Sequence, residues 1–106
     1  MNKVENNVIP EKKEGKATME GKVTFQKKEE NYHAYWLNDE TFTLEIGQAA
    51  NGECRILCEY HEDTGKYMVQ EWGEHGIKTI YSEYDGTDIL PKEDFDTIKC
   101  LMQQLM

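Results

Sequence analysis

Residues 54–84 read CRILCEYHEDTGKYMVQEWGEHGIKTIYSEY. Apolar and polar side chains alternate along short runs of this stretch, which is the period of an extended strand. Two segments that carry glycine, residues 62–65 and 73–76, interrupt the alternation and are typical of hairpin turns. The stretch therefore predicts three consecutive β-strands, and the rest of the fold is built around them.

Which side chains of these strands share a face of the sheet depends on the length of the first turn. A three-residue loop over residues 63–65, closed by a bulge, pairs Tyr60 with Met68. The same register pairs Ile56 with Trp72. A slip of one residue would reverse every facing on the second strand. The second turn fits a three- or a four-residue loop, so the facing of the third strand, residues 77–84, stays open. The first strand turns four apolar positions to one face: Cys54, Ile56, Cys58 and Tyr60.

The segments before this stretch also alternate with a period of two. Residues 22–27 predict a strand, and residues 28–31 predict a polar connection to a second strand over 32–37. Residues 38–40 have the composition of a turn, and residues 41–46 form the clearest alternating run in the chain. Residues 47–52 link this run to the central strands. No helical crossover separates the strands, so they predict an antiparallel meander.

The pattern changes after Asp85 and Gly86. Pro91 suits the first turn of a helix, and acidic residues follow it near the positive end of the helix dipole. Apolar residues then recur at helical spacing, and this stripe predicts a helix that lies on one face of the sheet. The predicted fold is α+β: an antiparallel meander sheet of five or six short strands with one C-terminal helix packed on one face. Residues 1–19 are expected to be a disordered tail, and residues 20–106 a single domain.

The charge of the chain excludes some classes of partner. Its 106 residues carry a formal net charge of -9. Residues 1–30 hold seven Lys and six Glu, so the remaining 76 residues carry five basic and fifteen acidic side chains. Direct binding to nucleic acid depends on basic residues that meet phosphates, and binding to anionic membranes has the same requirement. We therefore expect neither, and we expect a protein partner that is basic.

The three cysteines do not form a metal or disulfide pattern. Cys54 and Cys58 would stand about 13 Å apart on an extended strand, too far to share one zinc ion, and are expected to be small buried residues. Cys100 lies next to the helix stripe and is also expected in the core. An odd number of cysteines without a signal peptide predicts reduced thiols and a cytoplasmic location. Residues 83–88 match a calcium loop only at Gly86 and are better explained as a turn.

No pattern for catalysis is found. The histidines at positions 33, 61 and 75 belong to no nucleophile motif, and no glycine-rich phosphate loop is present. Strand carboxylates such as Glu45, Glu59 and Glu71 are more typical of a solvated sheet face than of a catalytic pair. We therefore expect a protein that is not an enzyme and needs no cofactor.

One sheet face remains as a candidate contact surface for a partner. Mixed aromatic, aliphatic and acidic side chains on an open sheet face can mark such a surface. The alternative is that the first two strands fold across this face and bury it, which would give a small barrel or sandwich. In the register above, the predicted partner-binding residues are Glu45, Leu57, Glu59, Tyr67, Val69 and Glu71.

These features predict a small acidic protein-binding module. Its negative field would raise the rate of association with a basic partner, and we expect an inhibitor that occupies a basic site on a nucleic-acid-handling protein. One alternative is a homo-oligomeric accessory domain, in which the sheet face or an edge strand pairs with a second copy as in a homodimer. Another is a small-ligand-binding domain with a pocket between helix and sheet, lined by Tyr60, Trp72 and Met102.

Overall fold

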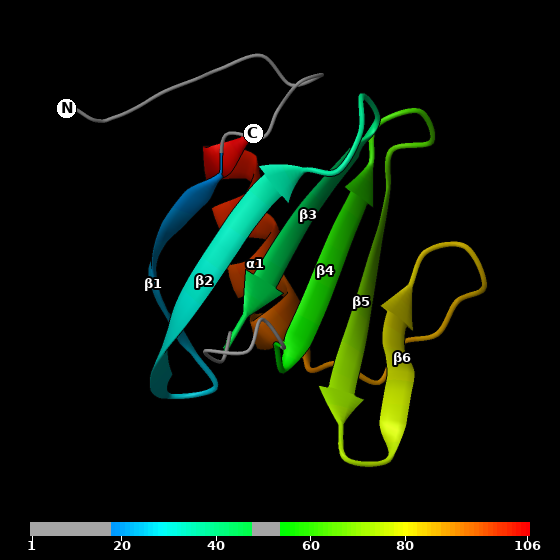
Figure 1. The fold of residues 1–106 in the computed structure, drawn as a ribbon. Helices are drawn as coiled ribbons and strands as arrows, with labels where there is room; N and C mark the ends of the chain where they lie inside the picture. The colour runs from blue at the N-terminus through cyan, green and yellow to red at the C-terminus, as the bar shows by residue number, and fades with distance from the viewer. Residues whose placement is uncertain (1–17, 48–53) are drawn as a thin grey trace, which may run out of the picture.

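The computed structural model describes residues 18–47 and 54–106. These residues form one six-stranded antiparallel sheet, with the strands in chain order, followed by one helix (Figure 1). The predicted meander and its C-terminal helix are confirmed. The predicted tail falls mostly on residues 1–17, outside the described residues, and Met19 already belongs to the first strand. The elements are β1 (Met19–Phe25), β2 (Lys28–Trp36), β3 (Thr41–Ile46), β4 (Ile56–His61), β5 (Lys66–Gly73), β6 (Gly76–Ser82) and α1 (Lys92–Leu105).

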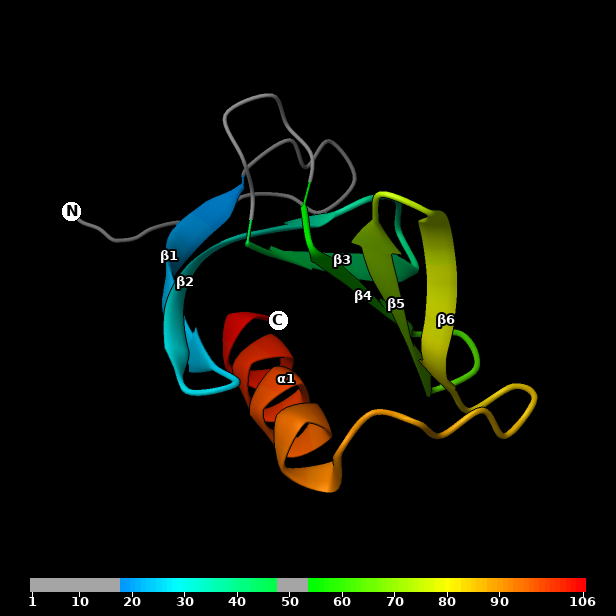
Figure 2. The ribbon, with the colours of Figure 1, turned by 90° about the horizontal axis from the view of Figure 1, so that it is seen from below.

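The sheet is strongly curved, and α1 lies against its concave side (Figure 2). We call the side that faces α1 the inner face and the opposite side the outer face. β1 and β2 continue the sheet beside β3 instead of folding across the outer face, so the barrel or sandwich alternative is wrong. The inner face supplies the core, because its alternate side chains are almost fully buried: Phe25, Ala34, Phe42, Leu44, Ile46, Ile56, Cys58, Tyr67 and Val69.

The helix packs through the predicted apolar stripe. Ile98 and Met102 have no exposed surface, and Phe95 stacks on Tyr81 of β6 with ring centroids 4.2 Å apart. Phe95 also meets Tyr67 of β5 edge to face, at 5.7 Å. The expectation that Cys100 is a core residue is wrong, because Cys100 is exposed. Its position, two residues after Ile98, is about 200° further round the helix and faces away from the sheet.

The register predicted between β4 and β5 is wrong by one residue. His61 pairs with Lys66 across a four-residue turn, and Tyr60 pairs with Tyr67 instead of Met68. Gly65 adopts a φ of 73° inside this turn, where its N–H donates to the His61 carbonyl oxygen at 2.7 Å. A glycine with positive φ suits both loop lengths, so the residue type alone did not fix the register.

Two further hairpin turns, by contrast, are shorter than predicted. Gln26 and Lys27 form a two-residue turn with φ values of 55° and 64°, as in a type I′ turn, so residues 28–31 belong to β2 and are not a loop. Gln26 is held there because its Nε2 donates to Asp94 Oδ2 of α1 at 3.2 Å. Between β5 and β6, Gly73 pairs with Gly76, which leaves a two-residue turn where three or four residues were expected.

Candidate contact surface

Three of the predicted contact residues come together on the outer face. Glu45 of β3 is directly opposite Leu57 of β4, and Glu59 is opposite Thr43, one position along the same face. Such cross-strand neighbours have their Cβ atoms within about 5.5 Å. Glu45, Leu57 and Glu59 are each half-buried, so their outer surfaces remain accessible. The outer face is therefore built from carboxylates beside an aliphatic side chain, as the alternation in β3 and β4 predicted.

The other three predicted residues lie elsewhere. Tyr67 and Val69 point to the inner face and are 6% and 0% exposed, so the assignment of both to the outer face is wrong. The cause is the one-residue shift in register, which places Met68 and Trp72 on the outer face of β5 instead. Glu71 pairs with the inner-face residue Ile56, so its assignment to the outer face is wrong as well, although Glu71 is exposed near the end of β5. There it lines an open groove of about 390 Å³ together with the β5–β6 turn.

Next to the predicted residues, the outer face holds a hydrogen-bonded acid–phenol pair. The Tyr35 hydroxyl donates to Glu45 Oε2 at 2.8 Å, and His33 Nδ1 lies 3.7 Å from Glu45 Oε1. Burial, and then the bond to Glu45, raises the pKa of Tyr35 to about 12. Burial also raises the pKa of Cys54 to about 11, with a smaller effect from Glu45. A thiol with such a pKa is protonated at neutral pH and is a poor nucleophile.

At one end of the sheet, two acidic turns lie side by side. We call this region the acidic end and define it as Asp39 and Glu40 of the β2–β3 turn with Glu62 and Asp63 of the β4–β5 turn. The turns are joined directly, because the Glu62 N–H donates to the Glu40 carbonyl oxygen at 2.7 Å. All four residues are exposed. The carboxylates therefore form one continuous region of negative charge at the ends of β3 and β4.

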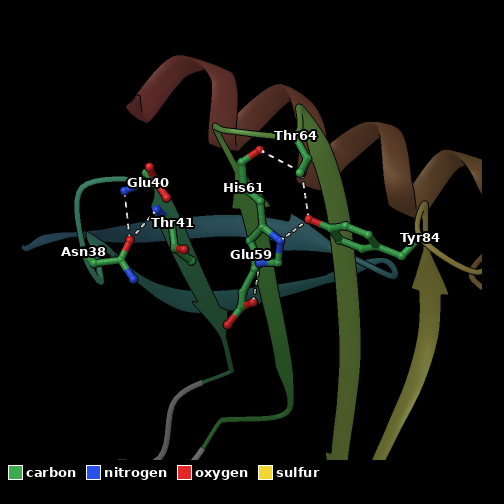
Figure 3. Close-up of polar contacts among 7 residues, drawn as sticks. All are labelled: Asn38, Glu40, Thr41, Glu59, His61, Thr64 and Tyr84. Atoms are coloured by element: carbon green, nitrogen blue, oxygen red, sulfur yellow. Dashed lines mark hydrogen bonds and ion pairs between the residues drawn. The ribbon is translucent and has the colours of Figure 1, made fainter.

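The β2–β3 turn is held by its own asparagine. Asn38 Oδ1 accepts hydrogen bonds from the backbone N–H groups of Glu40, at 2.8 Å, and Thr41, at 2.9 Å (Figure 3). This is the local bonding by which Asn stabilises turns. The Leu37 N–H also donates to the Thr41 carbonyl oxygen at 2.8 Å. The backbone that carries Asp39 and Glu40 is thus fixed before any partner binds.

A chain of polar side chains connects the acidic end to the outer face. Figure 3 shows the His61 ring between Glu59 and Tyr84. His61 Nε2 lies 2.8 Å from Glu59 Oε1, and its Nδ1 lies 2.5 Å from the Tyr84 hydroxyl. The same hydroxyl lies 2.7 Å from Thr64 Oγ1 in the β4–β5 turn. These contacts orient the His61 ring and fix Tyr84 at the border of the acidic end.

The acidic end borders an open groove of about 600 Å³. Two large apolar side chains stand in its lining, because Leu37 is 57% exposed and Tyr84 is 47% exposed. Carboxylates beside exposed apolar groups suit a basic side chain, whose aliphatic stem needs apolar contact while its charged head needs an acid. The lining residues are Leu37, Asn38, Asp39, Glu40, Thr41, His61, Asp63 and Tyr84.

The acidic end was not among the predicted contact residues, although the sequence carried a signal for it. In any antiparallel meander, alternate turns lie at the same end of the sheet, so the acidic turns at 38–40 and 62–65 had to be neighbours. Tyr84 could not be found in the same way. Its position depends on the path of residues 83–91, which follow no regular pattern of side chains.

Two other expectations concern ligands inside the fold. Trp72 lies on the outer face and Met102 is fully buried beneath the inner face, so Tyr60, Trp72 and Met102 do not line one pocket. Over the ranges 18–47 and 54–106, no group of three or more His, Cys, Asp or Glu side chains is placed to hold a metal ion. In these same ranges, no helix has the length and apolar character needed to cross a bilayer.

Comparisons with known proteins do not add to this geometry. No family model matches the chain, and no curated protein and no solved structure shows significant similarity to it. The function is therefore inferred from the fold, its charges and its surfaces.

Proposed function

We propose that this chain is a small, non-catalytic protein-binding module that inhibits a nucleic-acid-handling protein by occupying its basic site in the cytoplasm. The observation that carries this proposal is the acidic end, where two turns joined by a backbone hydrogen bond present four exposed carboxylates. A surface that binds nucleic acid presents Lys and Arg to closely spaced phosphates. A rigid group of carboxylates offers such a surface negative charge, as the phosphates do.

The outer face is expected to extend this contact. Glu59 and Glu45 continue the negative charge away from the acidic end, and Leu57, on β4 opposite Glu45, offers an apolar contact beside them. The net charge of -9 adds long-range attraction, which raises association rates more than it slows dissociation. Binding is therefore expected to weaken strongly with added salt.

The experiment compares two double charge reversals that change the net charge equally. Glu40→Lys with Asp63→Lys alters the acidic end, whereas Glu71→Lys with Glu74→Lys alters exposed residues near the β5–β6 turn. Cross-linking in host cells identifies the bound protein, which is then purified. Its association rate with each variant and its binding to a labelled nucleic acid are measured over a range of salt concentrations.

We expect the acidic-end variant to associate about tenfold more slowly than the wild type, and the control variant to change much less. The wild type should also displace the nucleic acid from the purified protein. Equal effects of the two variants would show that only net charge matters and would remove the acidic end from the contact. A bound protein that keeps its nucleic acid would overturn the proposed inhibition.

A further inference from the structure

The two edges of the sheet differ in how they are covered. At the β6 edge, the Ser82 N–H donates to the Thr87 carbonyl oxygen and the Ile89 N–H donates to the Ile80 carbonyl oxygen, both at 2.9 Å. Residues 87–89 thus cover part of β6. β1 forms the opposite edge (Figure 1), and no backbone group of the described residues bonds to its side away from β2. An open strand edge is a template for pairing with another strand.

The hairpin geometry determines which groups of β1 point outward. Phe25 and Lys28 flank the two-residue turn and form a pair that exchanges both backbone hydrogen bonds. Because such pairs alternate, every second residue before Phe25 also bonds to β2. The N–H and C=O groups of the residues between them point away from the sheet. These residues are Glu20, Lys22 and Thr24, and their side chains are exposed.

We propose that β1 pairs with β1 of a second copy of this chain, antiparallel and about a two-fold axis at Gly21. The outward backbone groups of Glu20 then meet those of Lys22 of the partner subunit, and the same contact repeats on the other side of the axis. The two sheets join into one continuous sheet through this edge.

The charges of β1 select this register over its neighbours. With Gly21 on the axis, each Glu20 faces a Lys22 on the outer face, so two pairs of opposite charges form. A shift by two residues in one direction sets Lys22 against its own copy, and in the other direction Glu20 against its own copy. Like charges directly opposite each other destabilise strand pairing. Lys22 is already oriented on the outer face, since its Nζ donates to Asn31 Oδ1 at 3.1 Å.

The inner side of β1 is complementary in the same register. Met19 and Val23 are half-buried against the core. In this register, Met19 of each copy would face Val23 of the other copy across the axis. Gly21 is needed at the centre, because a Cβ there would lie only 2.6 Å from the Tyr32 hydroxyl. The Tyr32 ring can therefore cover β1 close to the axis. An apolar strip from both copies would continue across the joined inner faces.

None of the acidic-end residues takes part in this pairing, so it can fail or hold independently of the proposed function. The test uses sedimentation velocity of the full chain over a wide concentration range. Lys22→Glu sets like charges opposite each other twice, and Glu20→Lys with Lys22→Glu restores opposite charges. Lys28→Glu is the control, because it makes the same change of charge on β2, away from the open edge.

We expect the wild type to form a dimer whose dissociation constant rises about tenfold or more in Lys22→Glu and returns close to the wild-type value in the double variant. Thermal unfolding of each monomer checks that the fold is kept. A second variant, Lys22→Pro, removes the outward N–H without removing a bond to β2 and should also weaken the dimer. A wild type that stays monomeric, or a dimer that responds equally to Lys22→Glu and Lys28→Glu, would overturn the proposal.

Discussion

Tyr84 and His61 are 23 residues apart in the chain, yet the Tyr84 hydroxyl lies 2.5 Å from His61 Nδ1. The same hydroxyl meets Thr64 Oγ1 at 2.7 Å, so one side chain joins the segment after β6 to the β4–β5 turn. The opposite nitrogen of His61 is engaged by Glu59 at 2.8 Å. These hydrogen bonds hold the segment between β6 and α1 against the acidic end. Removing the Tyr84 hydroxyl oxygen tests whether they do so.

Tyr84→Phe removes that oxygen and keeps the ring. We expect the free energy of unfolding to fall by about 1 kcal/mol or less, since these hydrogen bonds are exposed. Amide hydrogen exchange of residues 83–88 should become faster. Tyr60→Phe is the control, because no hydrogen bond of the Tyr60 hydroxyl is found in the described part of the chain. Equal exchange in both variants would show that the hydroxyl does not hold this segment.

Val69→Ala and Met68→Ala test the register of β5. Val69 is fully buried on the inner face, whereas Met68 is half-buried on the outer face. We expect Val69→Ala to lower the free energy of unfolding by about 1–3 kcal/mol, because it removes buried methyl groups and leaves a cavity. Met68→Ala should cost less, although it removes more atoms. Denaturant unfolding of both variants measures the difference, and the reverse order would mean that Met68 faces the helix.

Arg55 and Glu30 form an ion pair in which the carboxylate is 8% exposed and the guanidinium is 42% exposed. Removing the cation by Arg55→Met leaves a buried carboxylate without its charged partner. We expect a loss of about 1–3 kcal/mol, reduced by the partial exposure of Arg55. Adding Glu30→Gln to that variant should recover part of the loss. A double-mutant cycle measures the coupling, and strictly additive losses would show that the pair contributes nothing of its own.

Alkaline pH should destabilise the fold in a defined window. Burial and Glu45 raise the pKa of Tyr35 from 10.0 to about 12, and burial raises the pKa of Cys54 from 9.0 to about 11. The folded state therefore holds these protons more tightly than the unfolded state does. The contribution of Tyr35 and Cys54 to the free energy of unfolding is complete below about pH 9 and is lost as the pH rises toward 12. Denaturant unfolding across this range measures the decline.

Tyr35→Phe separates the two groups, because the phenylalanine ring has no proton to lose. The decline between pH 10 and 12 should become shallower in this variant, whereas the part between pH 9 and 10 should remain. An unchanged slope above pH 10 would show that Tyr35 does not contribute to the alkaline loss of stability.

The sequence predicted best the elements with a single clean period. Residues 41–46 became β3 without change, because apolar side chains occupy only one of the two alternating sets. The predicted helix is also found, with Pro91 directly before its first residue, since only the helical period places Phe95, Ile98 and Met102 on one face. These elements were predictable because one pattern of burial explained all of their residues.

The facing of β5 was less predictable, because both of its alternating sets contain large apolar residues. Tyr67 and Val69 compete with Met68 and Trp72 for the inner face, and only the length of the preceding turn decides. The turn at Gln26 and Lys27 was missed for another reason. Neither residue favours positive φ, so local preference gave way to the pairing of β1 with β2 and the bond to Asp94.

The candidate site was therefore only partly predictable. Glu45, Leu57 and Glu59 follow from alternation within single strands, and the structure brings them together. The assignment of Tyr67 and Val69 to the outer face depended on the predicted loop length, and it is wrong because that length is wrong. The acidic end follows from meander topology, but the contact between Tyr84 and His61 depends on a segment without regular structure, which no local pattern describes.

The two tryptophans lie on opposite sides of the curved sheet. Trp36 meets Phe42 edge to face on the inner side at 5.1 Å, while Trp72 lies on the outer side with its Nε1 donating to Gln70 Oε1 at 3.3 Å. The molecule thus carries two intrinsic fluorophores that report on different events. We expect emission from Trp36 to report on the packing of the core, and quenching of Trp72 to report on the binding of a partner to the convex side.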